Sequence, residues 1–260
     1  MSVLTFRSSE PPLCQEGRIV RGAITVDWKD WKPYLCNVNS KLASILVDLS
    51  LKNAVPVKAK PWLLWTWVYF KSPRPDGLSD GKEAPTLYQI EDALIESVSE
   101  ACRAIPCGRI TTEGRREFYF YGETIDGFHQ AVEGGMAGFE GYRFDLGEQM
   151  DPLWTQYFNV LYPSPENLQC ISNMDLLDVL VEKGDVLTVA REVQHWIYFG
   201  SESSRTSFRD AACVAGFKIG YERNSEGRLP FMVSVARTQP IDQKSIDRTV
   251  IELCAFASAA

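Results

Sequence analysis

The sequence predicts an α+β protein made of two tandem ferredoxin-like modules, that is, two split βαβ units with antiparallel sheets. Three observations lead to this prediction. Strand-like and helix-like periodicities follow each other in the order β-α-β-β-α in both halves. Prolines interrupt both periodicities at residues 163–167, which is the best candidate for a linker. The last expected helix runs almost to Ala260, so we expect the second sheet to lack its last strand.

We therefore place one module at residues 20–165 and the other at residues 166–260. A sheet without its last strand has an open edge, which is a hazard because unpaired backbone groups attract other strands. Two solutions are open: a further C-terminal segment, which we favour, or a strand supplied from elsewhere.

The first module begins with an additional strand at Ser44–Leu51, in which apolar residues alternate with a mixed face. The run Trp62–Phe70 has no polar face, which is typical of a central strand covered on both sides. The capping box Thr86–Gln89 predicts the start of a helix that ends before Pro106. A hairpin is expected at Gly108–Gly122.

A helix and a closing strand are expected to complete this module. The helix covers Ile125–Phe139, although Gly134, Gly135 and Gly138 each weaken it by about 1 kcal/mol relative to alanine. These glycines either permit close packing or end the helix early. The closing strand is expected near Trp154–Leu161.

The second module shows the same order with clearer boundary signals, because serine, asparagine and glycine stand where helices start and stop. The expected elements are a helix between Asn173 and Gly184, a strand at Arg191–Phe199, a helix from among Ser201, Ser203 and Ser204 to Gly216, a cleanly alternating strand at Phe217–Tyr221, a strand from Leu229 to Val235, and a helix at Asp242–Ala257.

Composition opposes a general role in binding nucleic acid or membranes. The formal net charge is −7, whereas phosphate neutralisation needs a basic surface. Residues 166–260 hold 10 Lys and Arg against 13 Asp and Glu, so the second module has no basic excess. The N-terminus lacks the pattern of a secretory signal, and the longest apolar run, at 62–70, is about half of a membrane span.

The cysteines and acidic residues predict no metal site. Seven cysteines are scattered without the paired spacing of a zinc site, which is typical of reduced thiols. The loop 73–83 gathers Asp76, Asp80 and Glu83, but leucine occupies the third position of any alignment with a calcium loop. We expect a cytoplasmic protein with no metal ion and no cofactor.

No nucleophile elbow, phosphate-binding glycine loop or zinc-protease helix is present, so the sequence does not support catalysis. Of the two histidines, His129 falls on the glycine-rich helix and His195 alternates with the apolar residues of its strand. We interpret His195 as a buried structural histidine.

An enzyme or small-ligand site is the alternative hypothesis. A deep pocket with convergent polar groups and perturbed carboxylates would favour it. Such a site is expected between the two modules, near Arg115, Arg116, Tyr119 and Tyr121.

The second module also predicts a contact surface. Trp196 and Tyr198 lie on the face of their strand opposite the core, near Met232 on a neighbouring strand. This face packs against the first module, binds another protein, or stacks RNA bases; the last is the weakest interpretation, because the strand around Met232 does not match the RNA-binding pattern. Arg205 and Arg209, behind a run of serines at a helix start, form either an anion site or a simple capped helix.

Two stretches carry a resemblance to known families. The order REVQHWIYF, SESSRTSFRDAACVAGFKIGYE and LPFMVSVARTQP, within residues 174–257, resembles the bacterial regulator of ribonuclease activity B. The motifs WLLWTWVYF, YQIEDALIESV and GRITTEGRREFYFYGE, within residues 20–165, are similar to a bacterial domain of unknown function, number 695.

The first resemblance implies a ferredoxin-like fold and a function. Members of that regulator family bind the noncatalytic region of ribonuclease E and inhibit RNA processing without being enzymes. We therefore expect a non-enzymatic cytoplasmic regulator that binds a protein partner, such as ribonuclease E or a related RNA-processing protein. The expected contact region is the Trp196 and Tyr198 face or the helix end with Arg205 and Arg209.

Overall fold

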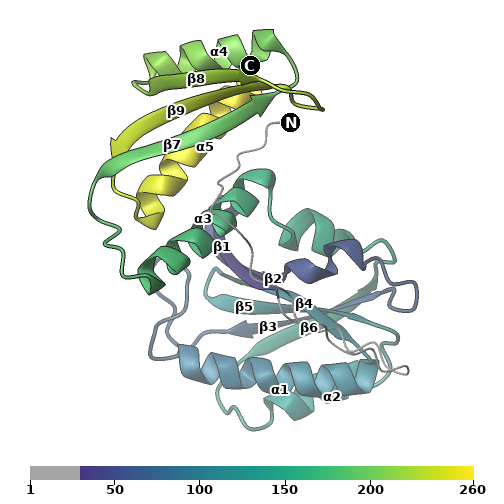
Figure 1. The fold of residues 1–260 in the computed structure, drawn as a ribbon. Coiled ribbons are helices and arrows are strands. Elements are labelled where there is room, and N and C mark those ends of the chain that lie inside the picture. Colours follow the sequence, from purple (N-terminus) through teal and green to yellow (C-terminus); the bar gives the residue numbers. More distant parts are fainter. Residues whose placement is uncertain (1–29) are drawn as a thin grey trace. The chain divides into compact units, whose positions relative to one another are not determined.

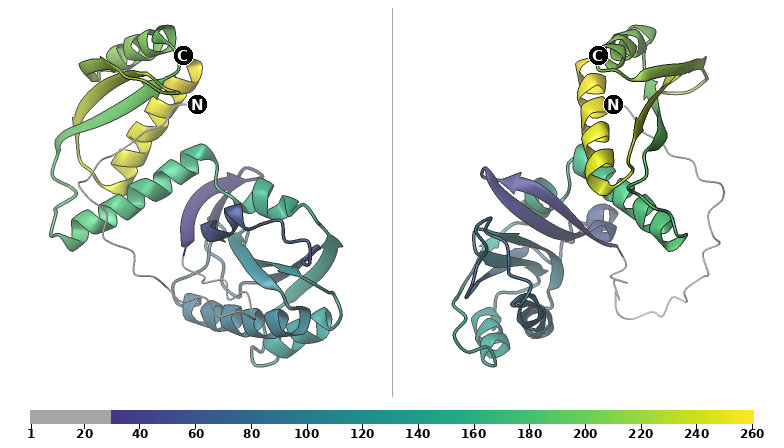
Figure 2. Two further views of the ribbon diagram at one scale, coloured as in Figure 1. Left: turned by 45° about the vertical axis from the view of Figure 1, so that its right-hand side comes forward. Right: turned by 90° about the vertical axis from the view of Figure 1, so that its left-hand side faces the viewer.

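The computed structural model describes residues 30–260, which form two compact units divided between Asn167 and Leu168 (Figures 1 and 2). Both units are α+β with an antiparallel sheet, as predicted. The elements of the N-terminal unit are β1 (Trp31–Val38), β2 (Lys41–Asp48), the 3₁₀ turn η1 (Leu49–Asn53), β3 (Trp62–Tyr69), α1 (Ala84–Cys102), β4 (Ile105–Thr112), β5 (Arg115–Gly122), α2 (Phe128–Met136), β6 (Phe144–Met150) and the π-helical turn η2 (Tyr157–Leu161). The helix α3 (Pro165–Glu182) then leads to β7 (Arg191–Phe199), α4 (Glu202–Val214), β8 (Lys218–Asn224), β9 (Phe231–Gln239) and α5 (Gln243–Ala259).

The N-terminal sheet has six strands in the order β1-β2-β4-β5-β3-β6. The central strand β3 pairs with β5 on one side and β6 on the other. Helices α1 and α2 cover one face of this sheet (Figure 1). Leu64, Phe118 and Phe120 of the sheet pack there with Leu94 and Val132 of the helices, all of them buried.

The N-terminal unit contains a leading strand, β1, that was not expected. It forms a hairpin with β2, through a turn in which Asn39 and Ser40 have φ values of 50° and 63°. Positive φ at both central residues is typical of the tight hairpin turn that matches strand twist. Pro33 lies in β1 and cannot donate a ladder hydrogen bond, which suits its place at the edge of the sheet.

The closing strand of the N-terminal unit is β6, and the prediction of a strand at Trp154–Leu161 was wrong. Asp151 accepts hydrogen bonds from the backbone N–H groups of Thr155 and Gln156 at 2.9 and 3.0 Å, which starts a helical turn. Trp154, Tyr157 and Leu161 then recur at helical spacing and are fully buried. Apolar residues at this spacing fit one side of a helical turn better than one face of a strand.

Helix α2 ends at Met136, three residues earlier than expected. One of its glycines also permits close packing: a Cβ atom on Gly135 would lie 2.9 Å from Ser97 Oγ and 3.3 Å from the Ala93 carbonyl oxygen, both on α1. A Cβ atom on Gly134 would have no neighbouring atom within 4 Å. Both expected roles of the glycines are therefore present.

Two helix starts were predicted wrongly. Helix α1 begins at Ala84, so the box Thr86–Gln89 lies inside the helix. Helix α3 begins at Pro165, so the last part of the expected linker is helical and Asn173 is not its cap. Proline is favoured in the first turn of a helix because its missing N–H would have no helical partner there.

The C-terminal sheet has three strands in the order β7-β9-β8, and α4 and α5 cover one face (Figure 2). Strand β7 and the starts of α4 and α5 follow the prediction, with Ser201 and Asp242 as N-caps. Within the described part of the chain β7 pairs only with β9. Strand β7 therefore forms an edge of the described sheet. The corresponding strand of the N-terminal unit, β3, has a second strand partner, β6.

Candidate functional site

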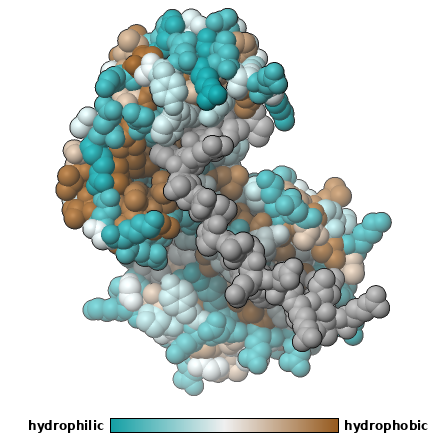
Figure 3. Space-filling view, viewed as in Figure 1, coloured by the Kyte–Doolittle hydropathy of each residue, from teal (hydrophilic) through white to brown (hydrophobic). Residues whose placement is uncertain are grey.

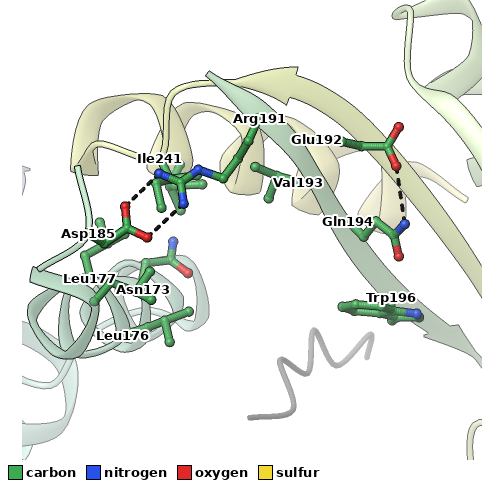
Figure 4. Close-up of a pocket in the computed structure, with 12 residues that line it drawn as sticks. Asn173, Leu176, Leu177, Asp185, Arg191, Glu192, Val193, Gln194, Trp196 and Ile241 are labelled. Carbon is green, nitrogen blue, oxygen red and sulfur yellow. Dashed lines mark hydrogen bonds and ion pairs between the residues drawn. The ribbon is translucent and has the colours of Figure 1, made fainter. Parts of the chain in front are cut away.

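A hollow of about 340 Å³ lies between α3 and β7 in the C-terminal unit (Figure 4). Leu177, Ile241 and Ile246, which line it, are buried, and Leu176 and Leu180 beside them are half-buried. These five side chains make an apolar base. A concave apolar surface of this size with a few polar groups at its rim is typical of a binding site.

The hollow opens onto the edge of β7. Glu192, Val193 and Gln194 are consecutive in this strand, and all three line the hollow. Successive side chains of a strand point to opposite faces of the sheet. Three neighbours can line one hollow only if it follows the side of the strand, where the backbone of β7 has no strand partner among the described residues.

The rim of the hollow is polar. Asp185 accepts two hydrogen bonds from Arg191, at 2.8 and 2.6 Å, so the pair closes one end (Figure 4). These hydrogen bonds lower the pKa of Asp185. Asn173 is buried at the α3 side and donates to Asp247 of α5 at 3.1 Å, which ties α3 to the unit.

Helix α3 carries only acidic charges. Its sequence contains no Lys or Arg, and Asp175, Asp178 and Glu182 are exposed at spacings of three and four residues. Residues at these spacings share one side of a helix. The helix therefore presents a negative stripe, which we call the acidic stripe, on the side opposite Leu176, Leu177 and Leu180, which line the hollow.

Exposed valines continue the apolar surface. Val186 and Val189, in the loop between α3 and β7, are more than half exposed, as is Val181. Hydrophobic residues gather on the flank of this unit where the chain enters β7 (Figure 3). Exposed apolar groups that continue a hollow indicate a contact surface.

The aromatic face predicted from the sequence is present, with one residue more than expected. Trp196 and Tyr198 are half-buried on the sheet face opposite α4 and α5, and Met232 stands opposite Tyr198 but is buried. The indole N–H of Trp196 donates to the Tyr221 hydroxyl at 2.9 Å. Trp196 also lines the hollow, so the aromatic face and the hollow are continuous.

The strand at Phe217–Tyr221 was expected to alternate cleanly, but β8 is irregular at its centre. A bulge between Ile219 and Glu222 shifts the register of β8 against β9. The shift turns Tyr221 to the opposite face, where it is 55% exposed. Gly220 permits this bulge, because a Cβ atom there would lie 2.3 Å from Ser234 Oγ.

Arg205 and Arg209 are held by carboxylates of their own unit. Arg205 is buried and lies 3.0 Å from Glu202 and 3.2 Å from Glu222. Arg209 lies 2.9 Å from Asp210 and 3.3 Å from Glu222. The helix start itself is capped, since Ser201 Oγ accepts from the Ser204 N–H at 3.1 Å. This geometry corresponds to the simpler of the two interpretations, a capped helix.

The residues of the alternative site divide between two faces of β5. Arg115 and Tyr119 both bind Glu117, at 2.6 Å each. Tyr121 donates to Asp151 at 2.5 Å on the same face. Burial and the neighbouring Glu117 raise the pKa of Tyr119, so it stays a neutral phenol. The polar side chains of Arg115, Tyr119 and Tyr121 are therefore engaged in hydrogen bonds within their own unit.

Arg116 points to the other face, toward α1. Its side chain is 4% exposed, and its Nη1 lies 3.6 Å from Glu91 Oε2. Arg109 also pairs with Glu91, and both guanidinium groups lie within 5.3 Å of the centre of the Tyr88 ring. Burial and the neighbouring Arg116 lower the pKa of Arg109 to about 10. One carboxylate thus pairs with two guanidinium groups, of which Arg116 is buried and Arg109 is half-buried.

The two histidines differ in their surroundings. His195 is 1% exposed in the core of the C-terminal unit, and burial together with Arg237 lowers its pKa to about 4. His129 is more than half exposed and lies 3.2 Å from Glu148. His195 is therefore neutral at physiological pH and serves as a core residue.

Residues 30–260 contain no group of His, Cys, Asp and Glu side chains with the geometry of a metal site. None of the helices in this range has the length and apolar character that crossing a bilayer requires. Sequence reasoning placed Leu176, Leu177 and Leu180 on one helix but did not assign them to a site. The clustering of these three leucines on one helix was the sequence feature that could have indicated the hollow.

Comparisons with known proteins agree with the resemblances seen in the sequence. Residues 29–162, just over half of the chain, match a family model described as a family of unknown function (DUF695). Residues 170–259 match a model described as regulator of ribonuclease activity B. No curated protein matches the chain.

Proposed function

Because the chain belongs to the DUF695 family of unknown function and its C-terminal segment matches the regulator of ribonuclease activity B, we propose that it regulates ribonuclease activity by binding another protein. The partner we propose is a protein of the ribonuclease E type, whose RNA processing the chain inhibits. The role is non-enzymatic and cytoplasmic. Both units are ferredoxin-like modules in this proposal, since the strand order β4-β5-β3-β6 with α1 and α2 on one face fits a split βαβ unit.

One observation carries the proposal: the match to the regulator family spans residues 170–259, and every residue that lines the hollow falls within that segment. The segment thus combines a regulatory family with an apolar hollow, a neighbouring aromatic face and an acidic stripe. Protein interfaces combine an apolar centre with a polar rim in this way.

The acidic balance supports competition with RNA as the mechanism. The chain has a formal net charge of −7, and the acidic stripe is exposed on α3. A basic, RNA-binding surface of a ribonuclease would attract such a protein, and opposite potentials raise the association rate more than the final affinity. Occupation of that surface would exclude the RNA substrate.

The proposal is tested with purified ribonuclease E in two forms, with and without its noncatalytic region. We expect the full chain to bind only the complete form in a surface-immobilisation assay, to bind it more weakly as salt rises, and to slow cleavage of a labelled RNA. Cleavage that stays unchanged at saturating concentrations of the chain would remove the proposal. Arg115, Arg116, Tyr119 and Tyr121 support no second candidate function, because their side chains interact within their own unit.

A further inference from the structure

We propose that helix α3 is a strap that releases from α5 and widens the hollow, while the rest of the C-terminal unit stays folded. This inference goes beyond the proposed function and does not depend on it, since it concerns the motion of one helix and not the identity of a partner. The elements that move in proteins are drawn from the least stable parts of a fold, which make few buried apolar contacts.

Helix α3 contributes little to the apolar core of its unit. The main cluster of buried side chains joins the sheet to α4 and α5, through residues such as Phe208 and Leu253. A second, smaller cluster contains Leu177, Val193, Ile241, Ile246 and Val250. Leu177 is the buried member that comes from α3, and Ile171, also buried, belongs to neither cluster. Release of α3 from α5 would therefore leave the main cluster intact.

A polar contact holds α3 to α5. Asn173 is 2% exposed, and its amide group donates to Asp247 Oδ1 on α5 at 3.1 Å. Gln243, one turn earlier on α5, donates to Asp247 Oδ2 at 2.7 Å and to the Cys170 carbonyl oxygen of α3 at 3.4 Å. We call Asn173, Gln243 and Asp247 the clasp. Such hydrogen bonds are modest in net terms, because water offers the same groups a bond when the helices separate.

The chain that follows α3 is fixed to the unit and supplies a hinge. Gly184 has a φ of 81°, a left-handed conformation that glycine adopts without strain after a helix. Asp185 then pairs with Arg191 at 2.6 Å, and the Leu187 carbonyl oxygen accepts from the Ile241 N–H at 2.9 Å. We therefore expect α3 to turn about this end when the clasp opens.

The hollow lies where such a motion has its effect. Asn173 of the clasp and the Asp185–Arg191 pair of the hinge both line it (Figure 4). Leu176 and Leu180 of α3 are half-buried, because they face this hollow of about 340 Å³ and not a further layer of side chains. Side chains without close neighbours lose the dispersion contacts that hold a packed helix in place.

Release of the clasp would enlarge the apolar surface of the hollow. Ile246 and Val250 of α5 are buried in the smaller cluster with Leu177, so they become accessible when α3 moves away. A molecule that binds apolar surface has more of it to contact in the released state. Such a molecule shifts the equilibrium toward that state, because it binds that state better. The clasp thus sets how much of the hollow is available.

Hydrogen exchange of the full chain, followed residue by residue at low urea concentrations, tests the release. We expect the amides from Asn173 to Glu182 to share one opening, roughly tenfold or more populated than the opening that exposes α4 and β9. Equal populations would mean that α3 opens only together with the whole unit, and would overturn the inference. This measurement needs no substitution, so it does not depend on the folding of a variant.

The variant Asn173→Ala tests the clasp. Alanine has a higher helix propensity than asparagine, so the change does not weaken the helix itself. We expect the α3 opening to become roughly tenfold more populated, with α4 and β9 unchanged. Ser172→Ala is the matched control, because Ser172 is exposed and its hydroxyl donates within α3 to the Leu168 carbonyl oxygen. Asp247→Asn keeps an acceptor for Asn173 and should have a smaller effect than Asn173→Ala.

The fluorescent probe anilinonaphthalene sulfonate, which binds exposed apolar surface, reports on the hollow itself. We expect severalfold more fluorescence with Asn173→Ala than with Ser172→Ala, at unchanged far-ultraviolet circular dichroism. Equal fluorescence, no change in α3 exchange, or a change spread equally over α3, α4 and β9 would each overturn the inference. Ribonuclease E takes no part in these measurements, so their failure leaves the proposed function standing, and failure of the proposed function leaves this inference standing.

Discussion

The two sheets of this protein follow a similar order of elements but end differently. In the N-terminal unit, β3 lies between β5 and β6, and its residues Leu64, Thr66 and Val68 are fully buried. In the C-terminal unit, β7 has one described strand partner and an apolar hollow along its other side. Proteins usually protect long sheet edges against unwanted pairing. Among the described residues, the two units therefore differ in whether the first strand of the repeated order has a strand partner on both sides.

The largest effect on stability is expected in the N-terminal unit, from removing the carboxylate of Glu91 on α1. Changing Glu91 to Gln leaves the buried Arg116 and the half-buried Arg109 without a carboxylate, and such a loss typically costs about 3–5 kcal/mol of unfolding free energy. Urea unfolding of the full chain, with hydrogen exchange of β4 and β5 amides, measures it. Glu96→Gln, at an exposed position of the same helix, is the matched control and should change stability by less than about 0.5 kcal/mol.

The next largest effect is a loss of stability at low pH, which is expected in the C-terminal unit because His195 is buried there. Its pKa is about 4 in the folded protein against an ordinary 6.5, so the unfolded chain binds an extra proton between these values. The contribution of His195 to stability is therefore complete above pH 6.5 and falls as the pH drops toward 4. We expect a loss of about 2 kcal/mol at pH 5 in the C-terminal unit.

Hydrogen exchange of the β7 and β9 amides at pH 7 and pH 5 measures this loss. The His195→Gln variant should lose this part of the pH dependence, while His129→Gln, which replaces an exposed histidine of the other unit, should keep it. Equal pH dependence in all three proteins would contradict the assignment to His195.

A smaller effect is expected at the bulge that turns Tyr221 outward. In the Gly220→Ala variant the added methyl group would lie against Ser234 Oγ, and overpacking of this kind costs about 1–3 kcal/mol. The cost should shrink in the Ser234→Ala background, where the oxygen is absent. Thermal unfolding of the four proteins of this double-mutant cycle tests the coupling, and additive effects would place the strain elsewhere.

Much of the C-terminal unit could be predicted from the sequence because its boundaries rest on local chemistry. Ser201 and Asp242 cap their helices through side-chain hydrogen bonds that any helix start at those residues would use. Strand β7 alternates cleanly from end to end, so its bounds were correct. Burial of His195 followed from the same alternation.

The remaining features depend on contacts between distant residues. The bulge at Ile219–Glu222 depends on how Gly220 meets Ser234 of another strand, so the alternation of this strand in the sequence did not reveal it. The turn after Asp151 depends on the capping carboxylate. The hollow was not predicted, because it requires α3 to lie beside β7, which the local sequence does not determine. The resemblance supplied the family but not the position of the site.

The smallest effect on stability is expected in α2 of the N-terminal unit, where the adjacent residues Gly134 and Gly135 have different surroundings. A Cβ atom on Gly134 would have no neighbouring atom within 4 Å, so Gly134→Ala should stabilise α2 by about 1 kcal/mol through helix propensity alone. Gly135→Ala gains the same propensity, but its methyl group meets Ser97 and the Ala93 carbonyl of α1. We expect that contact to cancel the gain. The urea midpoints of the two variants measure this difference in stability directly. Equal stabilisation would mean that α2 can move away from α1. The packing of the two helices in the N-terminal unit would then be less rigid than their buried side chains indicate.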